Sequence, residues 1–177
     1  MRQLASTALK RLNRTWRRRL SHRLCLVLHG VQSPYNVGAI VRTAATLGVD
    51  ELYLSGPTST PRHAHAQRVA MGTDRYLSIE TFDDASAAIS RARSSGYRVI
   101  ALELADEATP IQDCPLGADV CLVVGNEDHG LSVAHLAACD AATYIPQFGK
   151  VGSLNVSAAV AVACYEVRRQ QLGPVPG

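Results

Sequence analysis

The first stretch that could do chemistry, residues 36–43, combines an amide side chain with a guanidinium. Asn36 stands where an apolar run gives way to a helix, and Arg42 follows six residues later. Gly38 and Ala39 leave little bulk at the helix start, where free backbone N–H groups can meet a phosphate. The stretch therefore predicts a site for a phosphorylated ligand. A helix-capping asparagine and an unrelated surface arginine would leave the same pattern.

Two further polar stretches also follow apolar runs. Residues 125–132 form a turn between two glycines, and its Glu127 could orient a hydroxyl group or bind an arginine. Residues 145–157 lead through a glycine-containing loop to Ser153 and Asn155, which open an apolar helix. Such a loop can build a small pocket, rich in backbone groups, for a flat nucleoside-like ligand. The alternatives are ordinary loops in which the serines and Asn155 only cap helices.

Several catalytic signatures are absent from the sequence. It contains no GxGxxG turn, no GxxxxGK[ST] phosphate loop and no GxSxG nucleophile turn. His63 and His65 lie close together, but no third ligand accompanies them, so they indicate a surface turn rather than a metal site. We expect no metal ion.

The elements that must position the three stretches alternate between strands and helices. Strands are expected at 24–28, 51–54, 97–102, 120–124 and 143–145, and helices at 3–20, 36–47, 62–71, 85–95, after Ser132, and at 155–171. This alternation predicts an α/β fold, a mostly parallel sheet with helices on both faces. Ligands of such sheets bind beyond the carboxyl ends of the strands, where the loops 29–36, 102–109, 125–131 and 146–155 should meet.

Length and composition restrict the class of protein. The 177 residues predict one domain over 23–172, preceded by a basic extension over 1–22 and followed by a frayed tail over 173–177. With 47% hydrophobic and 19% charged residues, the chain is not disordered. No apolar run is long enough to span a membrane, and no secretory signal follows the basic start. The five cysteines form no CxxC pair, which fits a reducing cytoplasm.

Charge is distributed unevenly along the chain. Residues 1–49 carry nine of the 18 Lys and Arg side chains and none of the 15 Asp and Glu side chains. This basic end indicates a polyanionic partner such as RNA, and the candidate contacts are Arg11, Arg14, Arg17, Arg18 and Arg19. A solvated tail is the alternative. Because Leu4, Ala8, Leu12 and Trp16 share one face of the helix, this face should dock on the body or on a second subunit.

The three polar stretches together resemble the SpoU (TrmH-like) branch of the SPOUT RNA methyltransferases. The matching forms are NxGAIxRTA from Asn36, GxExxGLS from Gly125 and IPQxGxxxSLNVSxA from Ile145. The resemblance extends over about residues 24–170. It implies transfer of a methyl group from S-adenosylmethionine to a ribose 2′-hydroxyl of RNA, which leaves S-adenosylhomocysteine. It also implies a deep trefoil knot over about 120–160 and a homodimer with its sites near the interface.

The resemblance also implies roles for individual residues. Catalysis falls to Asn36, Arg42, Glu127, Ser153 and Asn155. The cofactor pocket is lined by Leu102, Gly125, Ile145 and Leu154. In our interpretation Arg42 binds the phosphate beside the target ribose, Asn36 holds Arg42 or the ribose, and Glu127 fixes that arrangement.

The short extension and the third motif favour tRNA, and guanosine within it, as the substrate. The alternatives are rRNA, as in enzymes that confer resistance to antibiotics, and a non-catalytic RNA-binding subunit with the same fold. A small-molecule methyltransferase is a further alternative, which the basic extension argues against.

Overall fold

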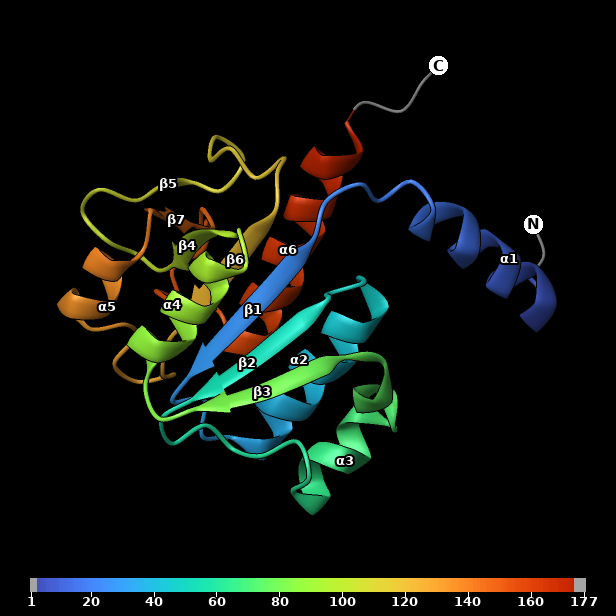
Figure 1. Ribbon diagram of the computed structural model, residues 1–177, viewed down its shortest axis with the longest axis horizontal. Coiled ribbons are helices and arrows are strands. Elements are labelled where there is room, and N and C mark those ends of the chain that lie inside the picture. The colour runs from blue at the N-terminus through green and yellow to red at the C-terminus, as the bar shows by residue number, and fades with distance from the viewer. Residues whose placement is uncertain (1–2, 174–177) are drawn as a thin grey trace.

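Seven strands, all paired in parallel, form one sheet with helices on each face in the computed structural model, which describes residues 3–173 (Figure 1). The strands are β1 (Leu24–His29), β2 (Glu51–Ser55), β3 (Ser78–Phe82), β4 (Arg98–Leu102), β5 (Thr109–Pro110), β6 (Val120–Val124) and β7 (Ala141–Tyr144), in the order β3-β2-β1-β6-β4-β7-β5. The helices are α1 (Ser6–Arg17), α2 (Pro34–Thr46), α3 (Ala64–Ala70), α4 (Ala85–Ser94), α5 (Val133–Ala138) and α6 (Val156–Leu172), with a 3-10 turn η1 (Thr73–Tyr76). The expected α/β fold is confirmed.

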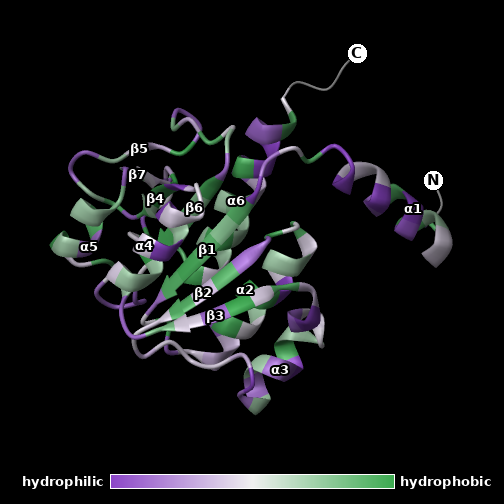
Figure 2. Cartoon of the chain, in the orientation of Figure 1, coloured by the Kyte–Doolittle hydropathy of each residue, from purple (hydrophilic) through white to green (hydrophobic). Residues whose placement is uncertain are grey.

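The position of β1 in the middle of the sheet explains why residues 24–28 form a continuous apolar run. Leu24, Leu26 and Leu28 pack into the layer that contains α2 and α6. Cys25 and Val27 point the other way and pack with α4. Both faces of the strand are therefore buried, as expected for a parallel sheet covered on each side. Figure 2 shows the hydrophobic colour along β1 in the middle of the sheet.

The observed elements differ from the expected ones mainly at the edges of the sheet. The sequence analysis missed the two edge strands, because β3 mixes exposed polar residues with half-buried ones and β5 has only two residues. Helix α2 starts at Pro34, since Ser33 caps it by accepting from the N–H of Asn36.

Two expectations about the chain are not tested by the structure. Residues 174–177 of the expected tail lie outside the described residues, and the knot stays a prediction. No helix between residues 3 and 173 is long and apolar enough to cross a membrane.

Helix α1 extends away from the body (Figure 1). None of its residues is buried, and Leu9, Leu12 and Trp16 are all exposed. The expectation that its apolar face docks on the body of the same chain is therefore wrong. Docking on a second subunit remains the open alternative.

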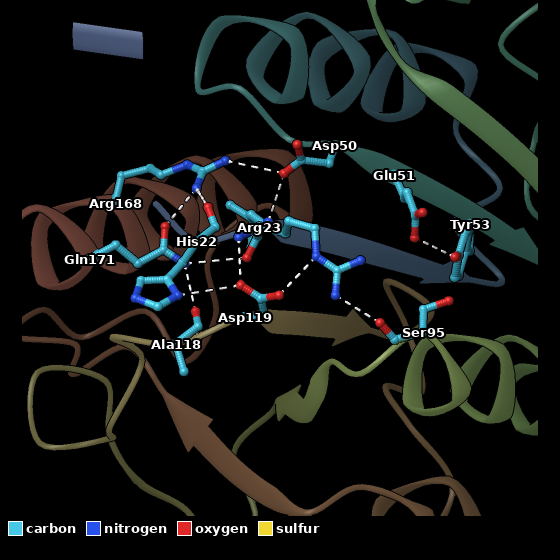
Figure 3. A network of polar contacts seen from close by, with 11 residues as sticks. His22, Arg23, Asp50, Glu51, Tyr53, Ser95, Ala118, Asp119, Arg168 and Gln171 are labelled. Carbon is cyan, nitrogen blue, oxygen red and sulfur yellow. Dashed lines mark hydrogen bonds and ion pairs between the residues drawn. The ribbon is translucent and has the colours of Figure 1, made fainter. Parts of the chain in front are cut away.

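A buried arginine in α6 ties the start of the body together at the end of the sheet opposite the carboxyl ends (Figure 3). Arg168 is 6% exposed, and its guanidinium donates to the carbonyls of His22 and Leu47, each at 2.9 Å, and to that of Gly48. Asp50 lies 3.6 Å from the same group. One side chain thus connects α6 to His22 before β1, to the end of α2 and to Asp50 before β2.

Replacing Arg168 with methionine should lower the free energy of unfolding by about 2–4 kcal/mol, because it leaves buried carbonyls without donors. Chemical denaturation measures the change. Arg169→Met is the matched control, since Arg169 is exposed and, within residues 3–173, pairs only with Glu166 on its own helix. It should cost less than about 1 kcal/mol. Equal losses in the two variants would contradict the prediction.

Candidate active site

A cleft of about 650 Å³ opens at the carboxyl ends of β4, β6 and β7. Its size falls within the range of small-molecule sites. The lining residues come from the loops after these three strands, from the start of α6 and from α2, and they are Asn36, Leu102–Leu104, Val124–Gly130, Tyr144, Ile145, Gln147, Gly152–Val156 and Ala159. This edge of the sheet is where the sequence analysis placed the ligand.

Hydrogen bonds join the three polar stretches into one chain across the cleft. The Nδ2 of Asn155 donates to the Oδ1 of Asn36 at 3.0 Å. The Nδ2 of Asn36 in turn donates to the Oε1 of Glu127 at 3.0 Å. Residues that lie 119 and 91 positions apart in the sequence therefore meet in one network. The expected pairing of Asn36 with Glu127 is present.

The cap of α6 sets the direction of this chain. The Oδ1 of Asn155 accepts from the N–H of Ser157 at 2.9 Å and from its hydroxyl at 2.6 Å. The Nδ2 of Asn155 must therefore point to Asn36, whose own Nδ2 is left to donate to an acceptor. The residue at position 127 must therefore accept this hydrogen bond from Asn36, which requires an oxygen with a free lone pair.

Glu127 is suited to this acceptor role. Burial alone would raise its pKa, but hydrogen bonds from Asn36 and from the backbone N–H groups of Glu127, Gln32 and Ser33 lower the pKa below its usual value. The carboxylate is therefore charged at neutral pH, and its Oε2 also accepts from the N–H of Gln32 at 3.3 Å. Both oxygens are engaged, so the side chain is fixed in place.

The four residues expected to hold the cofactor all line the cleft: Leu102, Gly125, Ile145 and Leu154. Three of them are apolar side chains, and Gly125 offers backbone only. A Cβ at Gly125 would collide with the backbone of Gly130 and Leu131. Apolar walls with backbone donors and acceptors suit a flat adenosine, so these residues fit S-adenosylmethionine. Ser153 also lines the cleft.

Glu103 is a cleft residue that the sequence analysis missed. Its Oε2 accepts from the N–H of Leu131 at 3.1 Å, and its Oε1 accepts from the N–H of Leu104 at 3.1 Å. The side chain thus braces the loop after β4 against the loop after β6. An acidic residue directly after a predicted buried strand, at the edge where ligands bind, was the signal that could have found it.

Arg42 lies outside the cleft of its own chain. It is exposed on α2, and its Nη1 lies 2.8 Å from the sulfur of Met71. Arg42 follows Asn36 by six positions. This spacing corresponds to about 9 Å along the helix axis and about 1.7 turns around it. Of the two partners expected for Asn36, Arg42 is therefore excluded within one chain, and the ribose is left.

Two other interpretations of α2 need correction. The alternative in which Asn36 only caps the helix is wrong, because Ser33 is the cap. Gly38 does not open a path for a phosphate: a Cβ there would lie 2.9 Å from both the Cα of Ala66 and the Cβ of Val69, so α3 occupies that space.

The arginines expected to bind RNA lie apart from the cleft. Arg11, Arg14 and Arg17 are exposed on α1, and Arg18 and Arg19 follow it. None of these five residues contributes to the cleft lining.

Comparisons with known proteins agree with this geometry. The model of the SpoU rRNA Methylase family matches residues 23–165. A tRNA (guanosine(18)-2'-O)-methyltransferase of Escherichia coli is 32% identical over 148 residues, which are 84% of this chain and 64% of that protein. An enzyme with the same description from Thermus thermophilus is 31% identical over 97% of this chain and 87% of its own length. The crystal structure of an AdoMet-bound rRNA methyltransferase from Sinorhizobium meliloti superposes with a TM-score of 0.77 at 29% identity, over 82% of this chain and 56% of that one.

Proposed function

The chain belongs to the SpoU rRNA Methylase family, and we propose that it transfers a methyl group from S-adenosylmethionine to a ribose 2′-hydroxyl of RNA. One observation carries the proposal. The three sequence motifs, far apart in the chain, are joined through Asn155, Asn36 and Glu127 at the wall of a cleft whose other residues suit the cofactor.

The chain's own residues then have to position the ribose and the phosphate beside it, which accepts the proton. S-adenosylmethionine supplies an activated methyl group on a sulfonium. Asn36, held by Asn155 and Glu127, orients the 2′-hydroxyl. Arg42 stays protonated in proteins and binds the neighbouring phosphate, and an oxygen of this phosphate takes the proton of the 2′-hydroxyl. Correct placement accounts for most of the rate increase.

The position of Arg42 supports a homodimer in which Arg42 of a second copy completes each cleft. Within one chain Arg42 does not reach the lining of the cleft. Helix α6 leaves apolar side chains open to a partner, since Val162 is exposed and Tyr165 is 65% exposed. Together with Ile111 they line a shallow hollow that a second subunit could cover.

We propose tRNA, with guanosine as the modified nucleoside, as the substrate. The support is the description of the two relatives from Escherichia coli and Thermus thermophilus. The Sinorhizobium meliloti structure favours rRNA as the alternative. A non-catalytic RNA-binding subunit is less well supported, because all five expected catalytic residues are present: Asn36, Arg42, Glu127, Ser153 and Asn155. The free thiols fit a cytoplasmic enzyme.

Incubation with labelled S-adenosylmethionine and separated total tRNA and rRNA tests the proposal. Nucleoside analysis should find the label in a 2′-O-methylated nucleoside of the tRNA fraction. Label in rRNA alone would replace tRNA by rRNA as the substrate. Cofactor binding without transfer to either RNA would favour the non-catalytic alternative.

We further propose that residues 1–22 are an RNA-binding extension of the methyltransferase domain over 23–172. Changing Arg17, Arg18 and Arg19 together to alanine should weaken RNA binding. It should also flatten the salt dependence by up to about 2–3 units, because each phosphate contact adds roughly 0.7–0.9 to the slope. Arg91→Ala is a control, since Arg91 lies on α4 and pairs with Glu80.

Sedimentation separates this proposal from its alternative. If the apolar face of α1 docks on a second subunit and the arginines are solvated, the triple variant should keep the salt slope, and replacing Leu12 and Trp16 with alanine should break the dimer. That result would leave α1 as a dimerisation element. Affinity for S-adenosylhomocysteine should not change in either case, because the cleft lies elsewhere in the chain.

A further inference from the structure

We propose that Tyr35 and His65 form an exposed platform on which a nucleobase beside the target nucleotide stacks. The inference rests on the proposed action on RNA and assigns a binding site on α2 and α3 to that substrate. The two rings are stacked, with their centroids 4.9 Å apart and their planes at 22°. Tyr35 is 56% exposed and His65 is also exposed, so the rings do not serve the core of the protein.

Tight packing of two helices creates the stack. Gly38 has no side chain, and Ala66 of α3 occupies the space in which a Cβ would stand. This close approach brings His65, the neighbour of Ala66, against Tyr35, which lies three residues before Gly38. His63 also contacts His65: its Nδ1 accepts from the backbone N–H of His65 at 3.2 Å, and the centroids of the two rings lie 5.2 Å apart.

The surroundings of the stack favour RNA over a protein partner. Residues 52–73 contain no Asp or Glu, and they carry Arg62 and Arg68, both exposed, besides the two histidines. Aromatic faces next to cations are the usual means of binding unpaired bases and their phosphates. An acidic peptide could pair with the arginines, but it would offer no planar group to stack on the exposed ring of Tyr35.

The platform lies where an RNA held by Arg42 would pass. Tyr35 lies seven residues before Arg42, and residues seven apart share one face of a helix, about 10 Å apart along its axis. Met71, at the end of α3, contacts Arg42 on this same face. A strand whose phosphate sits on Arg42 therefore places an adjacent base at Tyr35.

Two single-stranded RNAs of about 12 nucleotides, within the usual range of site sizes, test the platform. One is all uridine, and the other has the same sugar–phosphate backbone without bases. The full-length protein should bind the uridine strand about 5- to 100-fold more tightly, which is the usual effect of stacking one base. Tyr35→Ala and His65→Ala should reduce this ratio at least about fivefold, and Tyr35→Phe should keep it, because only the ring is needed.

Controls separate stacking from charge and from catalysis. Arg62→Ala should weaken binding of both strands by the same factor, since it removes a cation and leaves the stack. Equal affinity of the wild type for the two strands, or an unchanged ratio in Tyr35→Ala, would overturn the platform. Methyl transfer to total tRNA and rRNA is measured in parallel. Transfer without base preference overturns only the platform, whereas base preference without transfer overturns the proposed enzyme and supports the platform.

Discussion

Arg42→Ala should lower kcat for methyl transfer at least about 100-fold. S-adenosylhomocysteine should still bind with an affinity within a few fold of that of the wild type. The reason is the separation of the two sites: the residues that suit the cofactor line the cleft, and Arg42 lies outside it. Loss of Arg42 therefore removes the contact to the substrate phosphate and leaves the adenosine pocket intact. Single-turnover transfer and calorimetric titration measure the two effects.

Two further variants test this prediction, a conservative one at Arg42 and one at a residue far from the site. Arg42→Lys keeps the charge but loses the planar guanidinium that donates two hydrogen bonds to a phosphate. Its activity should therefore lie between that of Arg42→Ala and that of the wild type. Arg91→Ala should leave kcat unchanged. A comparable loss of cofactor affinity and of activity in Arg42→Ala would show that Arg42 supports the structure of α2 instead.

Mixing two inactive variants tests whether Arg42 acts across a dimer. A hybrid of Arg42→Ala with Asn155→Ala has one subunit with an intact cleft and one with an intact arginine. If the arginine serves the cleft of its partner, one site of each hybrid is complete. Activity should then return to roughly a quarter of that of the wild type after subunits exchange at random. If Arg42 serves its own cleft, no hybrid site is complete and no activity returns.

Individual residues show how much of the fold and of the candidate site could be predicted from the sequence. The continuous apolar run at 24–28 predicted a strand buried on both faces, and this strand lies at the centre of the sheet. The loops after the strands were placed at one edge by the rule for parallel sheets, and four of the expected cofactor residues line the cleft there. Patterns that follow from periodicity and connectivity were therefore predictable.

Contacts between distant segments were not predictable in the same way. Nothing in the pattern around Gly38 shows that α3 fills the space beside it. The distance of Arg42 from the cleft depends on helix phase and on where α2 begins, and the Ser33 cap moved that start to Pro34. The brace made by Glu103 depends on a loop that is adjacent only in the folded chain. Apart from the start of α2, these errors concern packing between elements.

Asn155→Ala should damage both cofactor binding and catalysis without unfolding the protein. We expect affinity for S-adenosylhomocysteine to fall roughly tenfold and kcat roughly 100-fold, since a small displacement of catalytic groups has effects of this size. The side chain caps α6 and also holds Asn36, while the residues around it line the cleft. Loss of a cap costs about 1 kcal/mol, which thermal unfolding should register as a modest decrease in Tm.

Two further variants separate the cap from the site. Asp84→Ala removes the cap of α4, on the other face of the sheet, and should cause a similar decrease in Tm with full activity. Asn155→Asp keeps a good cap but replaces the donor to Asn36 by an acceptor, so two oxygens face each other where a hydrogen bond stood. It should therefore keep the Tm and lose the activity. If Asn155→Asp were fully active, the chain from Asn155 through Asn36 to Glu127 would have no part in catalysis, and Asn155 would be a helix cap alone.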